Sequence, residues 1–226
     1  MMNYEVRSID YQDCKEWFLK KHYLKRLPSI SFCFGLYTKH QLIGVCSFGN
    51  AVPLTMKRSI CGEEFEHLVY ELNRLILNDG HEKNATSYFV SQCLNQLPKP
   101  LIVVSYADKS QGHQGYIYQA TNFMYLGLSH TQKDWVIKGQ EDKHTRTLMD
   151  EFAFTPNRIE LLKQKYGNDL YQVQREPKHR YVYFIGSKTQ KQKFIKALRY
   201  EIKAYPKGDN KRYDASYQPT TQIKLL

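Results

Sequence analysis

The sequence lacks any long hydrophobic run, and this absence limits where the chain can work. No apolar stretch approaches the roughly 18 consecutive residues that a membrane-spanning helix requires. Residues 1–10 carry charged and polar side chains at the positions where a signal peptide would have a continuous apolar segment. We therefore expect a protein of the cytoplasm without membrane contact.

Cysteine is scarce, and the patterns that bind metals are missing. The five cysteines are an odd number, and no two of them are spaced as CxxC. The HxH and HExxH patterns, in which neighbouring histidines hold one metal ion, are absent as well. The spacing thus predicts buried free thiols and gives no support to a metal site. A ligand set assembled across the fold from His22, His113 and Asp108 stays open.

Acidic residues are too few to balance the basic ones. The chain has 33 lysines and arginines against 22 aspartates and glutamates, which gives a net charge of +11 and a pI near 9.3. From Gln174 to the end, 13 basic residues face 4 acidic ones, a net of +9, and the preceding part carries only +2. This excess favours an anionic partner, and the tyrosines between these charges are typical of surfaces that hold phosphates and stack bases. We expect double-stranded DNA as the partner; a merely solvated basic face is the alternative.

Alternating apolar and turn-forming segments predict a layered α/β protein. With 226 residues and 42% hydrophobic side chains, the chain can bury the core of a large domain. A strand over 68–77, a helix over 86–97 with its cap at Thr86 or Ser87, and a strand over 101–106 imply a right-handed parallel crossover. The other expected elements are helices over 11–22, 116–122, 156–166 and 189–203, a hairpin over 31–37 and 41–48, and strands over 123–128 and 180–185.

One polar stretch, residues 132–149, offers a soft boundary within the chain. We expect residues 1–150 to form the catalytic domain and residues 151–226 to be a basic helix–strand–helix part packed on it. In the last expected helix, apolar residues recur every four positions, which leaves basic side chains on another face. The expected phosphate contacts are Arg180, Lys196, Arg199, Lys203, Lys211 and Arg212.

Several segments of the sequence resemble the core motifs of a known family. They are Glu71-Leu72-Asn73-Arg74-Leu75, Ser105-Tyr106-Ala107-Asp108, the run from Gly112-His113-Gln114-Gly115 to Phe123, and the shorter pieces His22-Tyr23-Leu24 and Phe48-Gly49. Together they make residues 15–130 similar to the Mom-like family of phage DNA-modification proteins. The resemblance implies an acetyltransferase-like (GNAT-like) α/β fold, which is a central mixed sheet flanked by helices, here with a basic C-terminal extension.

The resemblance also implies an activity. Mom-like proteins are associated with converting the exocyclic amine of adenine in DNA to a carbamoylmethyl derivative, which protects phage DNA from host restriction. A transferase acting on adenine N6 in the cytoplasm of a host cell is therefore expected. A conventional N-acetyltransferase of a protein or small amine and a non-catalytic DNA-binding protein are the alternatives, because a fold does not fix a function.

The loop expected to bind a donor departs from the acetyltransferase pattern. That superfamily wraps the diphosphate of coenzyme A with a glycine-rich turn, whereas residues 78–87 contain a single glycine. Backbone N–H groups at a helix N-terminus still bind phosphates. We keep an acyl-CoA-like donor, held by Asn84, Thr86 and Ser87, as an expectation.

The adenine amine is a poor nucleophile, so its modification needs positioning and proton removal. Asp108 follows a buried strand, where burial could raise its pKa, and it is the expected base or amine-orienting acceptor; a turn-capping aspartate is the alternative. On the superfamily's pattern Tyr118 is the expected general acid; the alternative is that it is only an aromatic residue of the core. Arg74 is central to a buried strand and needs an acid or phosphate, for which Asp108 is the candidate.

The remaining expected site residues lie at the strand ends and in the loop after Asp108. Ser105 is grouped with the catalytic residues. Aromatic side chains such as Tyr106 and Tyr116 could stack an adenine turned out of the duplex, with core packing as the alternative. The expected substrate-binding residues are His22, Asn73, Tyr106, His113, Tyr116 and Asn122.

Overall fold

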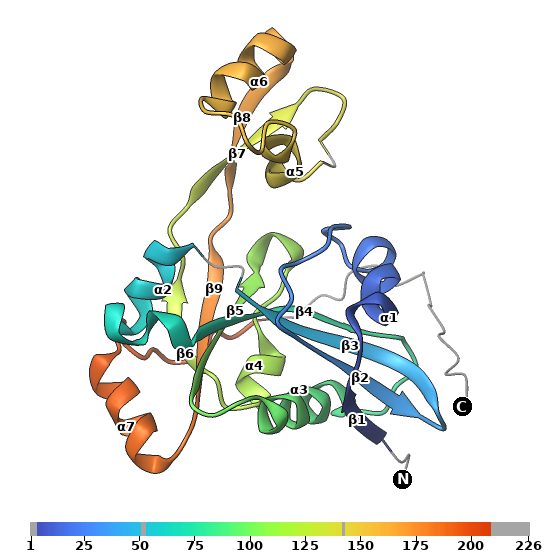
Figure 1. The fold of residues 1–226 in the computed structure, drawn as a ribbon, viewed down its shortest axis with the longest axis vertical. Coiled ribbons are helices and arrows are strands. Elements are labelled where there is room, and N and C mark those ends of the chain that lie inside the picture. Colours follow the sequence, from blue (N-terminus) through green and yellow to red (C-terminus); the bar gives the residue numbers. More distant parts are fainter. Residues whose placement is uncertain (1–3, 51–52, 142, 209–226) are drawn as a thin grey trace. The chain divides into compact units, whose positions relative to one another are not determined.

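The computed structural model describes residues 4–50, 53–141 and 143–208, and the chain divides into two compact units. The larger unit runs to Leu128 and resumes at Lys178, so the smaller unit, Ser129–Pro177, is an insertion in it (Figure 1). This division differs from the expected boundary near residue 150. The reason is that the chain from Lys178 onward returns to the sheet that the first part of the chain builds.

The larger unit is built on a seven-stranded mixed sheet with the order β1-β2-β3-β4-β5-β9-β6. Neighbouring strands are antiparallel except β4 and β5, which helix α3 (Ala85–Gln96) connects, so the expected parallel crossover is confirmed. The strands are β1 Tyr4–Ser8, β2 Phe32–Thr38, β3 Gln41–Gly49, β4 Val69–Leu77, β5 Leu101–Asp108, β6 Met124–Leu128 and β9 Lys178–Ile185.

Helices cover both faces of this sheet. Val103 of β5 packs in the core with α3, whereas Ile102 and Val104 pack with α2 and α7, because successive side chains of a strand point to opposite faces. Beside α2 and α7, helix α1 covers the part of that face formed by β2, β3 and β4. The mixed α/β sheet flanked by helices is therefore confirmed. The helices are α1 Tyr11–Glu16, continued by a π-helical turn Trp17–Lys21, α2 Leu54–Cys61, α4 Tyr116–Ala120 and α7 Lys188–Ala197.

The sheet opens between its two parallel strands. Only the residues Val69–Glu71 of β4 are in register with β5. Further along, β4 stays paired with β3 as far as Leu77, and β5 stays paired with β9 as far as Asp108. The two strands therefore diverge, and their ends border a space that side chains must line.

The inserted unit has a small core of its own. Strands β7 (Gln132–Ile137) and β8 (Leu170–Arg175) form an antiparallel pair, accompanied by helices α5 (Thr145–Asp150) and α6 (Arg158–Tyr166). Ile137, Leu148 and Leu162 form its buried cluster. The polar stretch 132–149, expected as a soft boundary, thus contains strand β7 and most of helix α5 of the inserted unit.

Other expected elements keep their type but change their bounds. Helix α3 begins at Ala85, because Asn84 takes the left-handed conformation (φ 71°) and ends the preceding loop, so the expected cap at Thr86 or Ser87 is wrong. Helix α7 ends at Ala197 instead of 203. Beyond it the backbone N–H groups of Arg199 and Lys203 donate to carbonyls of Ile60 and Tyr125, so contacts with the rest of the unit replace helical bonds.

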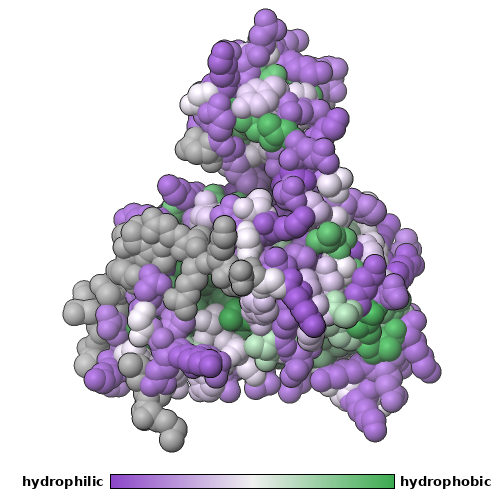
Figure 2. All heavy atoms as spheres, turned by 180° about the vertical axis from the view of Figure 1, so that it is seen from behind, coloured by the Kyte–Doolittle hydropathy of each residue, from purple (hydrophilic) through white to green (hydrophobic). Residues whose placement is uncertain are grey.

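Hydrophilic side chains dominate the face of the molecule drawn in Figure 2, and hydrophobic residues show on it as small separate groups. The longest helix of the described residues, α3, has 12 residues, whereas a membrane span needs roughly 20. Within the described part of the chain, no helix is long and apolar enough to cross a membrane.

Candidate active site

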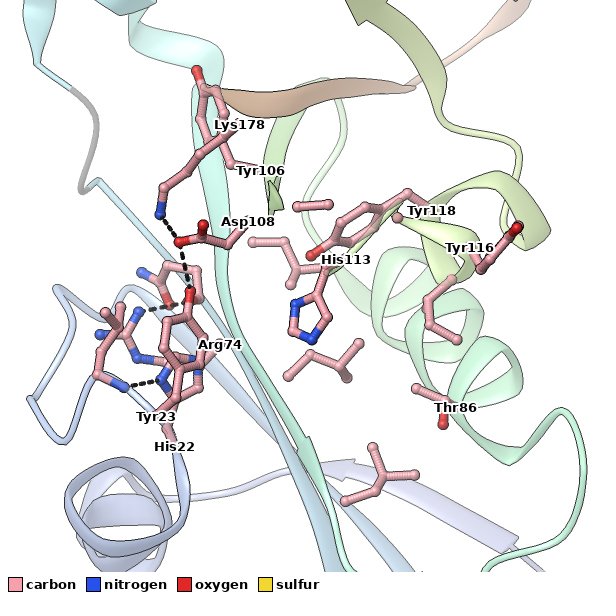
Figure 3. A pocket seen from close by; sticks show the side chains of 18 of the residues that line it. His22, Tyr23, Arg74, Thr86, Tyr106, Asp108, His113, Tyr116, Tyr118 and Lys178 are labelled. Atoms are coloured by element: carbon pink, nitrogen blue, oxygen red, sulfur yellow. Dashed lines mark hydrogen bonds and ion pairs between the residues drawn. The ribbon is translucent and has the colours of Figure 1, made fainter. Parts of the chain in front are cut away.

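A cavity of about 410 Å³ lies where β4 and β5 diverge (Figure 3). Its walls come from β4, the end of β5, α4, the first turn of α3, the segment His22–Leu24 and the first residue of β9. All of these belong to the larger unit. The diverging strands thus bring together side chains that are far apart in the sequence.

The Asp108 carboxylate is buried at the end of β5 and surrounded by donors. The Lys178 ammonium lies 2.7 Å from Oδ2, and Ser110 donates its hydroxyl (2.7 Å) and its backbone N–H (3.1 Å) to Oδ1. The Tyr23 hydroxyl donates to Oδ2 at 3.4 Å. Burial pushes the pKa of Asp108 up, but the charge of Lys178 and the hydrogen bonds outweigh it, so the pKa is lowered from its ordinary 3.8. Asp108 is therefore an ionised acceptor, and the expectation of a raised pKa is wrong.

Arg74 lines the cavity from the middle of β4. It follows a β-bulge, in which Asn73 is the extra residue between two positions paired with β3, and such bulges re-aim the neighbouring side chains. The buried guanidinium donates to the carbonyls of Asn73 at 2.7 Å and Arg26 at 3.2 Å. The cation in contact with Asp108 is Lys178, where the sequence had suggested Arg74.

Tyr118 of α4 lies on the side of the cavity opposite Tyr23 and Arg74 (Figure 3). Its ring packs against Phe123 and Tyr181, with centroids 5.4 and 5.2 Å away. Burial raises the pKa of Tyr118 to about 12, although an interaction with Ser105 acts in the other direction. Tyr118 therefore keeps its proton at neutral pH and can donate it. Ser105 itself is fully buried and donates its hydroxyl to the Leu72 carbonyl at 2.9 Å, so it supports the wall of the cavity.

A group of aromatic rings lines the cavity beside Asp108. The rings of His22 and Tyr23 are stacked at 4.4 Å, and His113 meets Tyr23 edge-on at 6.5 Å. Burial, together with the charges of Arg74 and Lys178, holds the pKa of His22 well below 6.5, so this imidazole is neutral. Its Nδ1 accepts the backbone N–H of Leu24 at 3.1 Å, which places the ring proton on Nε2. Burial and the charge of Asp108 raise the pKa of Tyr23, which keeps its hydroxyl protonated.

A comparison with known protein families identifies this arrangement. The model of the Mom protein family matches residues 3–207, which is most of the chain. The chain belongs to the Mom protein family. The match extends past the residues 15–130 that carry the sequence motifs and includes the inserted unit and most of the basic C-terminal part. The family predicted from the motifs is therefore confirmed.

A relative and several solved structures are similar to the chain. The methylcarbamoylase Mom of Escherichia phage Mu is 28% identical over 192 residues, which are 83% of this chain and 77% of that protein. A ribosomal-protein-S5-alanine acetyltransferase from Vibrio fischeri is 13% identical with a TM-score of 0.45 and covers 81% of this chain and 94% of its own. A putative acetyltransferase from Acinetobacter baylyi is 10% identical with a TM-score of 0.45 and covers 84% of this chain and 96% of its own.

Of the other expected substrate-binding residues, most line the cavity of this Mom family member. Asn73 does so while its amide bridges β3 and a loop, accepting from the Ser47 hydroxyl and donating to the Ser29 carbonyl, both at 2.7 Å. Tyr106 and Tyr116 contribute to the wall as well. Asn122 does not belong to it; it occupies a left-handed position (φ 61°) between α4 and β6, which is a reason in backbone geometry for an asparagine there.

Of the three residues expected to hold a donor, one lines the cavity and two do not. Thr86 lines the cavity from the first turn of α3. Asn84 forms the left-handed cap of that helix, and Ser87 donates its hydroxyl back to the Asn84 carbonyl at 3.0 Å. Asp79 and His81 of the preceding loop also line the cavity, so the site offers an anion both a helix N-terminus and an opposing carboxylate.

The expected DNA contacts divide into exposed and buried side chains. Lys196, Arg199 and Lys203 are exposed. Arg180 is only 4% exposed, and its guanidinium lies 4.1 Å from the centre of the Tyr200 ring, so it is a packed residue of β9. The expected contacts Lys211 and Arg212 lie outside the described residues.

Sequence reasoning missed part of the cavity wall. Lys178 follows the inserted unit, Tyr23 and Glu71 belong to family motifs without an expected role, and Asp79 and His81 carried no signal of their own. The sequence did indicate a site role for Tyr23 in one way, since Tyr23 is next to His22 in the motif. Among the described residues, no three histidine, cysteine or acidic side chains lie close enough to hold a metal ion, so His22, His113 and Asp108 do not form a ligand set.

Proposed function

We propose that this protein transfers a carbamoylmethyl-type or acyl-derived group to the exocyclic N6 of adenine in double-stranded DNA and so protects phage DNA from restriction. The observation that carries the proposal is the cavity in which an ionised carboxylate, Asp108, and a protonated hydroxyl, Tyr118, line the gap between β4 and β5. Family membership supports it, since the relative from phage Mu is named a methylcarbamoylase.

The chemistry asks for an acceptor that orients the amine and a donor that protonates the carrier. The reaction forms a bond between N6 and a carbon of the transferred group and breaks the bond between that carbon and its carrier. Asp108 accepts a hydrogen bond from the amine and stabilises the positive charge that grows on N6 during attack. Its lowered pKa makes it a weak base, so the N6 proton passes to solvent. Tyr118 protonates the departing carrier and regains its proton from solvent.

An adenine must leave the duplex to reach this cavity, because its amine is otherwise stacked and paired. The wall suits a flat, uncharged ring. His22 is neutral, Tyr23 is protonated and Tyr106 also lines the cavity, so the base would meet aromatic surfaces in a cavity that holds the ionised acceptor Asp108. The volume of about 410 Å³ leaves room for a base and for the end of a donor.

Exposed lysines lie on α7 and on the segment that continues from it to the rim of the cavity. Lys191 and Lys196 on α7 and then Lys203 and Lys207 are exposed. The segment after α7 is attached along the sheet and α4: the backbone of Lys203 bonds to Tyr125, the Tyr205 hydroxyl to the Phe123 carbonyl at 2.8 Å, and the Tyr116 hydroxyl to the Gly208 carbonyl. Since Tyr116 lines the cavity, phosphates held along this segment would bring a DNA strand to the site.

The donor would enter from the N-terminus of α3. Thr86 and the N–H groups of the first turn suit an anionic group, whereas the Asp79 carboxylate opposes one, so the fit to a coenzyme A diphosphate is partial. An acyl-CoA-like thioester would supply the transferred group in activated form. Isothermal titration of coenzyme A into the unaltered protein and into a Thr86→Val variant tests this part of the proposal. No heat of binding with the unaltered protein would remove coenzyme A as the carrier.

The alternatives predict different products. A conventional N-acetyltransferase would modify a protein or small amine and leave nucleosides unchanged, and a DNA-binding protein would modify nothing. The decisive experiment is expression in bacteria followed by mass spectrometry of DNA nucleosides. A new deoxyadenosine species, together with resistance to restriction enzymes that cut at adenine-containing sites, is the expected result. Unchanged nucleosides from cells that contain soluble protein would overturn the proposal.

A matched pair of variants connects this product to the cavity. Asp108→Asn keeps the shape of the side chain and removes its charge, and it should abolish the new nucleoside while DNA affinity stays nearly intact. Asp13→Asn changes an exposed acid in the first turn of α1 and should leave the product unchanged. Full modification by Asp108→Asn would remove Asp108 from the reaction.

A further inference from the structure

Lys178 directly follows the inserted unit and is the first residue of β9. The register of β5 and β9 places it opposite Asp108, and its ammonium lies 2.7 Å from Oδ2 of that residue. The side chains of Lys178 and Asp108 are 23% and 8% exposed, so the pair is largely shielded from solvent. A shielded pair interacts more strongly than one on an open surface.

The other groups around Asp108 come from different elements. Ser110, in the turn after β5, and Tyr23, before β2, donate hydrogen bonds but carry no charge. Arg74 on β4 and His113 after β5 line the same cavity, and the neutral His22 is stacked on Tyr23. Lys178 is thus the cation that the structure places in direct contact with the carboxylate.

We propose that Lys178 is a positioning residue for the reaction, which holds Asp108 as an ionised acceptor in the place where the substrate amine meets it. The inference rests on the proposed function for the identity of that amine. Without the ammonium, burial would raise the pKa of Asp108 and increase the share of the protonated acid, which offers an O–H donor where the amine requires an acceptor. The first residue after the insertion thereby influences what the motif residue Asp108 can do.

Three variants of the full chain test the pair itself. Lys178→Met removes the charge, Lys178→Arg keeps it, and Lys99→Met is a matched control on an exposed lysine before the other end of β5. Carbon-detected NMR titration of the Asp108 carboxyl should show a raised pKa in Lys178→Met and no change in the other two. An unchanged pKa in Lys178→Met would overturn the inference. Lys178→Gln, titrated in the same way, serves if Lys178→Met does not fold.

The rate of DNA modification gives a second readout. In Lys178→Met the rate at neutral pH should fall on the order of 100-fold, as expected when an orienting group is misplaced. The acidic limb of the pH profile should move to higher pH, because activity needs the carboxylate, and Lys178→Arg should restore most of both. A lower rate with an unmoved acidic limb would leave Lys178 only a structural role. If the titration shows the shift but the unaltered protein modifies no DNA, the ion pair stands and the proposed function fails.

Discussion

At the scale of single residues, the cavity contains groups in different protonation states. Asp108 is held ionised by Lys178 and by hydrogen bonds, whereas Tyr118 and Tyr23 are held protonated by burial. His22 is held neutral by burial and by nearby positive charge. These are the protonation states that the residue types already favour at neutral pH, and burial, neighbouring charges and hydrogen bonds reinforce them.

The lowered pKa of Asp108 makes a contribution to stability that depends on pH. The unfolded chain binds a proton at Asp108 near pH 3.8, and the folded chain binds it only at lower pH. The contribution is fully present above the unfolded pKa and is lost as the pH falls through the folded pKa. Urea unfolding between about pH 6 and about pH 3 should therefore show the difference in unfolding free energy between the unaltered protein and Asp108→Asn shrinking towards acid. A difference independent of pH would contradict the lowered pKa.

The hydroxyl of Tyr118 can be removed without emptying its place in the core. Tyr118→Phe keeps the ring that packs on Phe123 and Tyr181, so the melting temperature should stay close to that of the unaltered protein. If the hydroxyl protonates the carrier, the modification rate should fall on the order of 100-fold. Tyr88→Phe, which alters an exposed tyrosine of α3, is the control and should keep its rate. An unchanged rate in Tyr118→Phe would make Tyr118 a core aromatic residue only.

At the scale of elements, the start of α4 depends on one glycine. Gly115 adopts φ 77°, which favours glycine, and a Cβ built there would lie 2.5 Å from Cε2 of Tyr181. The Tyr181 hydroxyl also donates to the Gln114 carbonyl at 2.5 Å, so this contact fixes the turn that leads into Tyr116 and Tyr118. Any side chain at position 115 must displace either the turn or the ring.

Gly80 provides the matched control for this turn. It has a similar φ of 80°, but a Cβ there would meet no atom within 4 Å. Gly115→Ala should lower the unfolding free energy by about 3 kcal/mol or more, since strain and a clash add up, and Gly80→Ala by about 1 kcal/mol from backbone strain alone. Chemical denaturation of both variants measures the difference. Equal losses would mean that the contact with Tyr181 does not constrain α4.

At the scale of the whole molecule, positive charge is unevenly distributed between the units. The inserted unit Ser129–Pro177 has eight lysines and arginines and eight acidic residues, so the net charge of +11 belongs to the remainder of the chain. Part of it lies on the exposed segment from α7 to Lys207. We therefore expect the larger unit to determine the salt dependence of DNA binding.

DNA affinity should fall as salt rises, with a log–log slope of about −0.9 for each phosphate neutralised. Replacing Lys196 or Lys203 by Gln should weaken binding almost equally for all DNA sequences and reduce the slope by about one, because phosphate contacts do not read bases. Lys138→Gln in the neutral inserted unit and Asp108→Asn should leave the slope unchanged. Fluorescence anisotropy at several salt concentrations checks this. An unaltered slope in the Lys196 and Lys203 variants would assign their charge to solubility.

Local patterns in the sequence determined the elements and the family. Alternation and helical spacing predicted the hairpin, β4, β5 and the crossover helix, because periods of two and of about four residues reflect which side chains are buried. The motifs around Arg74, Asp108 and Tyr118 predicted the Mom family, and the structure places all three in one cavity. The bounds of several helices departed from the pattern, most of all α7, whose end is replaced by contacts with the rest of the unit, and the elements β1, α2, β7, α5 and β8 were not predicted.

Tertiary structure alone decided which groups meet in the cavity. The gap between β4 and β5 arises because each strand follows a different neighbour, and the partner of Asp108 is Lys178 because β9 returns to the sheet after the inserted unit. The same return buries Arg180 against Tyr200, away from the phosphates that the sequence suggested for it. Strand register between distant segments leaves no periodic trace in the chain, so the electrostatic partner of a motif residue cannot be read from the motif.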